Sequence, residues 1–404
     1  MEDAVVPGRH FNSPGDEGKG NMSAEQGFTG RSTADFFVVP VKGGNPRRIT
    51  SDNRNKGGAA WSPGGKEIIF AAWWAPPISG GSLWRVPVSG GVPALISGVG
   101  AGAGYPSISR AGHRLAYQQT STKQSIWRLD LKDHKHAKGA PSLLIAEAGS
   151  MMRPHFSPDG KRIAFESARL GFPEIWVCNA HGSNCAQLTA LHRVAGAPQW
   201  SPDGRYIAFE FHPGEQREIY VLDVASGQAR LLPTNPGWDN LAPGWSRDGK
   251  WLYFGSRRGA GPLRFQLWKA PLNGGSPVQV TKNGGLQALE SADSRFLYYT
   301  KYDVPGIWKM PAGGGEETLV IRDFNSILFR NWTVGEKGIY LIGFRTHSQG
   351  TIEFFDFSTR VMTPVWDLEK VAGWGLTLSP DGQTLAYVQN DLNESNIMVV
   401  NNFR

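Results

Sequence analysis

The sequence predicts an all-β protein built from repeats, and three observations lead to this prediction. A block of similar sequence recurs eight times along the 404 residues, about every 45 residues. Each block combines turn residues with short segments in which every second residue is apolar, as in a half-buried strand. No segment keeps the apolar period of an amphipathic helix over three turns.

The repeated block reads as a β-hairpin. Its clearest copies are FSPDGKRIAF at Phe156, WSPDGRYIAF at Trp200, WSRDGKWLYF at Trp245 and LSPDGQTLAY at Leu378, and weaker copies start at Trp61, Ile108, Glu290 and Trp332. Pro, Asp and Gly in the Ser-Pro-Asp-Gly element favour a tight turn. An Ile or Leu and, two residues later, an aromatic residue or Leu follow the turn, which places both side chains on one strand face. We expect the turn aspartates to be structural rather than catalytic.

Two further strands complete each repeat. A third segment follows about 20 residues after each block begins, as in SLWRVPV from Ser82 and EIWVCN from Glu174. A turn, rich in Gly in several repeats, then leads to a short fourth segment such as PALIS or CAQLT. Four short antiparallel strands in each of many repeats predict a β-propeller, in which every repeat is one blade.

The repeats predict eight four-stranded blades, with seven blades as the main alternative. The segment ADFFVVP (residues 34–40) resembles a third strand and PRRIT (46–50) a fourth, whereas the last repeat supplies three strands over residues 378–400. We therefore expect the C-terminal strands to pair with PRRIT and to close the ring, with NIMVV rather than ADFFVVP in the third position. The propeller would span residues 34–404, and residues 1–33 would be disordered or the remnant of an N-terminal segment.

Composition and motifs exclude several classes of protein. No apolar run is long enough for a membrane helix, so we expect no membrane insertion. The net charge of +7 is scattered without a basic stripe, so we expect no nucleic-acid binding by the propeller. No catalytic or metal-binding motif is present, so we expect a non-enzymatic protein with no cofactor, metal or catalytic residue.

The blocks (W/F)SPDG(K/R)xIAF, followed by EIW-like and QLT-like strands, resemble the TolB-type (WD40-like) β-propeller repeat family. This resemblance implies a non-catalytic scaffold for protein–protein interactions, a monomer located in the periplasm, with the cytoplasm as the alternative. The sequence departs from TolB in having eight repeats where six are typical, and in showing neither a mixed α/β domain before the propeller nor an export signal.

Two other functions stay open at the level of sequence. Similar repeats form the C-terminal sensor or regulatory propeller of bacterial signalling proteins that carry a DNA-binding or kinase domain. They also occur in propeller hydrolases and lyases, which would have an active site in the channel.

Two groups of residues are candidate sites. Residues at or just before the first strand of a blade would line the channel mouth and bind an acidic loop or peptide of a protein partner: Arg153, His155, Gln199, Asp239 and Arg330. Cys178 and Cys185 flank the turn NAHGSN and could form a disulfide, which would favour an oxidising compartment. The register is not fixed by the sequence, so free thiols remain the alternative.

Overall fold

The all-β prediction is confirmed by the computed structural model, whose described residues contain strands and no helix. The described residues are 3–9, 34–41, 44–51, 56–72, 81–100, 102–109, 113–146, 150–170, 172–214, 216–234, 237–259, 265–325, 329–344 and 350–403. The chain divides into two compact units, of which unit 1 comprises Met1–Ser121 with Asn393–Arg404 and unit 2 comprises Thr122–Leu392.

Unit 2 contains five four-stranded antiparallel sheets in which strands follow one another in chain order. The first comprises β12 (Met151–Phe156), β13 (Arg162–Ser167), β14 (Glu174–Asn179) and β15 (Ala186–Gln187), and the second β16 (Ala195–Trp200), β17 (Tyr206–Phe211), β18 (Glu218–Asp223) and β19 (Ala229–Leu231). The third comprises β20 (Asn240–Trp245), β21 (Trp251–Ser256), β22 (Gln266–Pro271) and β23 (Val278–Gln279), and the fourth β24 (Ala288–Glu290), β25 (Phe296–Thr300), β26 (Ile307–Pro311) and β27 (Thr318–Ile321). The fifth comprises β28 (Trp332–Val334), β29 (Gly338–Phe344), β30 (Gly350–Asp356) and β31 (Met362–Asp367).

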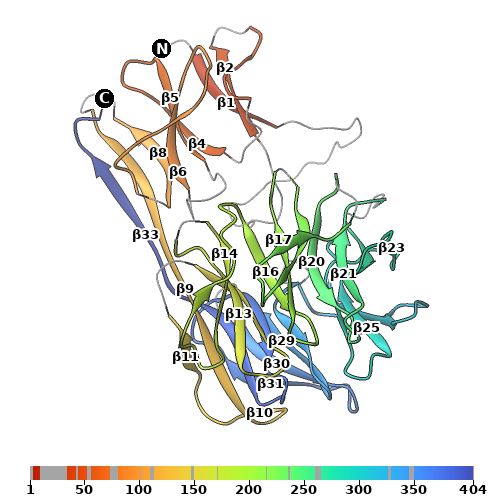
Figure 1. Cartoon of the computed structure of the whole chain (residues 1–404). Coiled ribbons are helices and arrows are strands. Elements are labelled where there is room, and N and C mark those ends of the chain that lie inside the picture. Colours follow the sequence, from red (N-terminus) through yellow and green to blue (C-terminus); the bar gives the residue numbers. More distant parts are fainter. Residues whose placement is uncertain are drawn as a thin grey trace. The chain divides into compact units, whose positions relative to one another are not determined.

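A sixth sheet combines strands from distant parts of the chain. In unit 2 it consists of β32 (Ala372–Leu378), the first half of β33 (Thr384–Val400), the second half of β9 (Leu115–Asp133) and β11 (Ser142–Ile145), with the short β10 (His136–Ala137) beside β9. Figure 1 shows β9 and β33 as two long neighbouring strands. The Leu131 N–H donates to the Gln383 carbonyl oxygen at 2.8 Å across this pairing.

The first strands of the six sheets contact one another in a closed cycle, from β12 through β16, β20, β24, β28 and β32 back to β12. Unit 2 is therefore a closed ring of six sheets, and its core lies between neighbouring sheets. Ile163, Phe165 and Trp176 of the first sheet, for example, pack against Ala386 and Val388 of the sixth sheet. Burial of these apolar faces stabilises the ring, because a twisted sheet needs a partner on each apolar face.

Unit 1 contains two further sheets and the remaining halves of the long strands. One sheet comprises β1 (Asp3–Arg9), β2 (Ala34–Pro40) and β3 (Arg47–Arg48), and the other β4 (Lys56–Trp61), β5 (Glu67–Ala72), β6 (Ser82–Pro87) and β7 (Ala94–Leu95). In addition to these two sheets, β8 (Ala103–Ile108) pairs with the first half of β9, which lies next to the second half of β33. The first two sheets share a core that includes Phe36, Ile68 and Phe70.

The expected ring closure is not what the structure shows. β33 pairs with β9 and β32, whereas Arg47 and Arg48 of the PRRIT segment pair with β2. The physical reason is that β9 and β33 each continue as one strand past the positions at which the other repeats turn, so each has an edge that can pair with the other. The count of eight four-stranded blades is also not confirmed, because the closed ring of unit 2 contains six sheets.

One segment without a predicted strand is ordered as a strand. Asp3–Arg9 forms β1 by antiparallel pairing with the whole length of β2, from Asp3 opposite Pro40 to Arg9 opposite Ala34. The pairing satisfies backbone groups of β2 that would otherwise form an open sheet edge. The expectation of disorder for residues 10–33 lies outside the described residues.

Candidate functional site

The first strands of all six sheets in unit 2 surround a hollow of about 470 Å³. Each sheet contributes a residue near the end of its first strand: His155, Gln199, Trp245, Leu289, Thr333 and Thr377. The Ser-Pro-Asp-Gly turns that follow three of these strands add Pro158, Pro202 and Pro380 to the lining. The hollow therefore lies where the six repeats converge, and rigid turns form part of its rim.

The turns that border the hollow are held by their own aspartates. Ser157 Oγ donates to Asp159 Oδ1 at 2.6 Å, and the Lys161 N–H donates to the same oxygen at 3.1 Å. The same pair of hydrogen bonds recurs in the turns with Asp203, Asp248, Asp293 and Asp381. These carboxylates accept hydrogen bonds within the turn, in agreement with the structural role expected from the sequence.

His155 supplies a neutral hydrogen-bond donor to the lining. Its Nδ1 accepts the Trp200 N–H at 3.2 Å, so the hydrogen of the neutral ring belongs on Nε2. Burial and the nearby positive charge of Arg247 lower the pKa of His155 to about 4. The imidazole is therefore uncharged at neutral pH.

Charges of both signs surround the hollow. Arg247 and Lys337 contribute cations, and Glu290, Glu336 and Asp381 contribute carboxylates. Glu290 is already engaged, because it accepts hydrogen bonds from the Tyr253 hydroxyl at 2.8 Å and the Arg247 N–H at 2.7 Å. The lining is mixed rather than basic, so it does not favour acidic partners by charge alone.

We call the first strands of the six sheets the inner strands. A repeated β-bulge lies in three of them, at the end away from the hollow. Arg153, Ala197 and Ala242 have φ values of 57°, 55° and 56°, and the pairing register of their strands shifts at these positions. A proline, which has no N–H to donate to the ladder, follows each of them. The bulge frees the N–H of Ala242, which donates to a Glu210 carboxylate oxygen at 2.6 Å.

A buried ion pair crosses the ring at the end of the inner strands that carries the bulges. Arg330, just before β28, pairs with Glu210 on β17, and their two sheets lie on opposite sides of the six-sheet ring. Only 7% of Arg330 is exposed. Burial would raise the pKa of Glu210, but the charges of Arg330, Arg217 and Arg153 lower it to about 2. Burial outweighs the charge of Glu210 and lowers the pKa of Arg330 to about 10.

Two further pairs surround this contact. Arg153 pairs with Glu166, and its guanidinium carbon lies 5.7 Å from the ring centre of Trp374. Arg217 binds Asp239 through two hydrogen bonds of 2.8 and 2.6 Å. Burial would raise the pKa of Asp239, and the hydrogen bonds and charge of Arg217 lower it.

The five residues predicted for the channel mouth thus divide into two groups. His155 and Gln199 line the hollow. Arg153, Asp239 and Arg330 instead form ion pairs at the opposite end of the inner strands, which carries the bulges. Sequence reasoning missed Glu166 and Glu210, although a glutamate at the same place in IAFE of two repeats was a visible signal. The pairing of Arg330 with Glu210 had no such signal, because 120 residues separate them.

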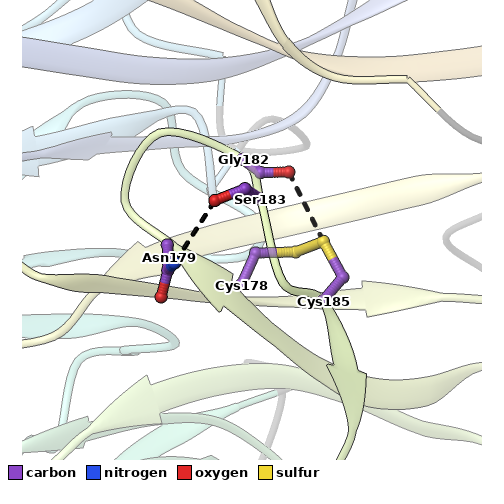
Figure 2. The surroundings of a disulfide bond; sticks show 5 residues. All are labelled: Cys178, Asn179, Gly182, Ser183 and Cys185. Carbon is purple, nitrogen blue, oxygen red and sulfur yellow. Dashed lines mark hydrogen bonds between the residues drawn. A yellow bond between two sulfur atoms is a disulfide. The ribbon is translucent and has the colours of Figure 1, made fainter.

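Cys178 and Cys185 are joined by a disulfide, and their Cα atoms lie 4.0 Å apart (Figure 2). The turn between them is closed by the Gly182 N–H, which donates to the Asn179 carbonyl oxygen at 2.8 Å. Asn179 Nδ2 also donates to Ser183 Oγ at 3.2 Å, as Figure 2 shows. The disulfide links the third strand of the first sheet to the residue just before the fourth strand.

Among the described residues, no group of three or more His, Cys, Asp or Glu side chains is arranged to hold a metal ion. The same part of the chain contains no helix long and apolar enough to cross a membrane.

Comparison with known proteins identifies the class of repeat. Residues 139–320 match the family described as the TolB beta propeller domain. Over residues 139–320, this match confirms the resemblance to the TolB-type repeat that was expected from the sequence.

One solved structure supports the β-propeller fold, and a second is reported beside it for comparison only. A putative TolB from Agrobacterium tumefaciens is 18% identical with a TM-score of 0.55, over 67% of this chain and 99% of that protein. TolB from Acinetobacter baumannii is 17% identical with a TM-score of 0.48, over 68% of this chain and 65% of that protein. No curated protein matches the chain by sequence.

Proposed function

We propose that the protein is a non-catalytic β-propeller scaffold that binds an exposed segment of a protein partner in the hollow on the ring axis. The observation that carries this proposal is a difference between the two ends of the inner strands. At one end these strands surround a hollow of about 470 Å³. At the other end the ion pair between Arg330 and Glu210 crosses the ring. A partner segment would therefore enter from the end that bears the Ser-Pro-Asp-Gly turns.

The lining favours a polar, extended peptide segment. His155 Nε2 and the Gln199 amide offer hydrogen-bonding groups, and Trp200 and Trp245 offer aromatic surface. Because cations and carboxylates both occur around the hollow, the partner needs no strong net charge. This revises the acidic partner expected from the sequence, since Arg153 and Arg330 already bind glutamates of the chain.

The disulfide supports the periplasm as the compartment of this scaffold. Disulfides persist in oxidising compartments such as the periplasm and are rare in the cytosol. The TolB-type repeat points in the same direction, because the resemblance to TolB implies a periplasmic protein. We take the monomer as the working unit of the scaffold.

A capture experiment tests the proposed site. The full chain would serve as bait in native extract, and bound proteins would be identified by mass spectrometry for the wild type and two variants. Gln199→Trp fills the hollow, whereas Thr318→Trp adds the same bulk to an exposed groove between the fourth and fifth sheets.

We expect Gln199→Trp to lose at least nine-tenths of a specifically captured partner and Thr318→Trp to retain it, with both variants melting within a few degrees of the wild type. Equal retention by the two variants would exclude the hollow as the binding site. Reversal of charge at Arg153 or Arg330 is a poor test, because it breaks buried ion pairs that hold the fold.

A further inference from the structure

A groove of about 640 Å³ lies between the fourth and fifth sheets of unit 2. Phe296 and Tyr298 of β25 and Lys309 of β26 line it from the fourth sheet. Phe355 of β30 and Phe357, which follows β30, line it from the fifth sheet. All residues that line the groove belong to unit 2. Its volume suits a small molecule, since such ligands occupy pockets of roughly 300–1,000 Å³.

The groove exists because a small residue ends the first strand of the fifth sheet. In the second and third sheets this strand ends in a tryptophan that packs against the preceding sheet. Trp200 shares a core with Ala164 of the first sheet, and Trp245 shares one with Ala208 of the second sheet. The first strand of the fifth sheet ends at Val334, which is much smaller than tryptophan. The groove therefore corresponds to space that an indole ring fills between other sheets.

Between the third and fourth sheets, a carboxylate stands at the same place. Glu290 ends the first strand of the fourth sheet, and the Tyr253 hydroxyl of the third sheet donates to Glu290 Oε1 at 2.8 Å. Tyr253 lies opposite Lys269 in the pairing of β21 with β22. This interface shows which group the chain itself places beside such a tyrosine, namely a carboxylate.

The fourth sheet repeats the tyrosine and lysine of the third sheet, but the fifth sheet supplies no carboxylate to them. Tyr298 lies opposite Lys309 in the pairing of β25 with β26, at the corresponding positions of the repeat. Val334 stands in the place of Glu290, and its side chain cannot accept a hydrogen bond. Within the part of the chain that the structure describes, the Tyr298 hydroxyl has no hydrogen-bond partner and the Lys309 ammonium has no carboxylate partner.

The Tyr298 hydroxyl is a hydrogen-bond donor that is held in place. Only 5% of Tyr298 is exposed, and its ring stacks on that of Phe357 with the ring centres 5.2 Å apart. Burial and the negative charge of Asp293 raise the pKa of Tyr298, so the hydroxyl keeps its proton at neutral pH. A fixed donor without a partner in the wall of a groove favours a ligand that carries an acceptor.

The side chains that line the groove carry a net positive charge. Arg295, Lys309 and Arg360 contribute cations, and Asp293 and Glu336 contribute carboxylates. Arg295 and Asp293 pair with each other, with 2.5 Å between Arg295 Nε and Asp293 Oδ2. Lys309 and Arg360 remain against Glu336 alone, so the groove favours an anionic ligand over a neutral or cationic one.

We propose that the groove between the fourth and fifth sheets binds a small aromatic carboxylic acid. The carboxylate accepts a hydrogen bond from the Tyr298 hydroxyl and is attracted by the Lys309 ammonium. It thereby takes the part that Glu290 plays for Tyr253. The aromatic ring fills the space left by Val334 and lies against the phenylalanine rings of the two walls. This site does not depend on the proposed binding function, because neither Tyr298 nor Lys309 lines the hollow.

Three probes test the chemistry of the site on the wild-type full chain, by isothermal titration calorimetry at pH 7. Indole-3-acetate carries both a ring and a carboxylate, indole-3-acetamide has the ring without the charge, and hexanoate has the charge without the ring. We expect indole-3-acetate to bind with a Kd below about 1 mM and each of the other probes to bind at least tenfold more weakly. Absence of binding at that level, or equal affinity for the acetate and the acetamide, would refute the proposal.

Matched variants test whether the probe occupies the groove. Lys309→Met removes the cation and keeps an unbranched apolar side chain, so the affinity for indole-3-acetate should fall at least tenfold. Lys269→Met makes the same change at the corresponding position of the third sheet and should retain the wild-type affinity. Tyr298→Phe removes only the hydroxyl and should lower the affinity about fivefold. Thr318→Trp fills the groove and should abolish binding.

All four variants should melt within a few degrees of the wild type. Equal affinity of Lys309→Met and Lys269→Met, or binding that survives Thr318→Trp, would place the probe elsewhere on the chain and overturn the proposal. The comparison of probes on the wild type needs no variant, so it decides the question even where a substitution lowers stability.

Discussion

Arg330 and Glu210 illustrate how single residues hold the ring of unit 2. Their sheets face each other across the ring, and both side chains are buried, so each charge depends on the other. Removal of one partner from such a pair leaves an uncompensated buried charge, which is costlier than the loss of an exposed ion pair. We therefore expect this contact to dominate the electrostatic contribution to stability.

Glu210→Gln should lower the free energy of unfolding by about 3 kcal/mol at pH 7, as measured by urea denaturation. The folded pKa of Glu210, about 2, lies below its unfolded value of 4.5. Its contribution is therefore complete above pH 4.5 and is lost as the pH falls toward 2. Asp223→Asn is the matched control, because it breaks the exposed Arg205 pair and should cost much less stability than Glu210→Gln. Equal losses from the two variants would contradict the proposed importance of the buried pair.

Titration of His155 should cause a second, separate loss of folding stability at acid pH. Its folded pKa of about 4 lies below the unfolded value of 6.5, so the unfolded chain binds the additional proton between these values. This contribution to stability is present above pH 6.5 and should fall by about 2 kcal/mol at pH 5. His155→Asn can retain an acceptor for the Trp200 N–H without titrating, so its stability should change less between pH 7 and 5.

The matched variant for this measurement is His136→Asn, which changes an exposed histidine. It makes the same substitution at a residue that does not line the hollow. If His155→Asn gives the same pH dependence as the wild type in thermal melts, burial of a neutral His155 is not the source of the transition.

At the scale of elements, the Ser-Pro-Asp-Gly hairpins were predictable because their determinants are local. Ser157, Asp159 and Gly160 lie within four residues of one another and close the turn with their own hydrogen bonds. The continuation of β9 as a single strand was not predictable in this way. It depends on pairing with β33, and the residues that contact across the two strands are more than 250 positions apart. The same limitation applies to Arg330, whose carboxylate partner lies on a distant repeat.

The first hairpin of unit 1 offers a test of the turn chemistry. Its sequence WSPGGKEIIF has Gly64 where other copies have aspartate, and Ser62 already makes the expected bonds to Gly65 and Glu67. A side chain added at Gly64 meets no atom within 4 Å. Gly64→Asp should therefore stabilise unit 1 by about 0.5–1 kcal/mol, through hydrogen bonds within the turn.

Asp203→Ala is the reciprocal change and should destabilise unit 2 by about 1 kcal/mol without affecting capture of a partner. Hydrogen–deuterium exchange of the two turns can measure both effects separately. Faster exchange in the turn of Gly64→Asp would show that the aspartate does not stabilise this turn.

At the scale of the whole molecule, the sequence predicted a propeller correctly but counted its blades from repeats alone. Eight copies of the block are present, yet the closed ring of unit 2 uses six sheets, and its last sheet takes strands from β9, β11, β32 and β33. Repeat counting assumes that the strands of each repeat pair with one another. Because β9 and β33 pair between repeats, the ring closes at a smaller number of sheets.

Ring closure by β9 and β33 can be measured directly with Asp130→Cys and Thr384→Cys in the full chain. Thr384 Oγ1 donates to Asp130 Oδ1 at 3.0 Å across the two strands, and 254 residues separate them. We predict that most chains form this disulfide without dimerisation, and that it raises the melting temperature, because it closes a very long loop. The positive control is Tyr206→Cys with Asp223→Cys, because these residues lie opposite each other on β17 and β18. Failure of the Asp130 and Thr384 cysteines to join, under conditions in which the control pair is fully oxidised, would contradict the closed six-sheet ring.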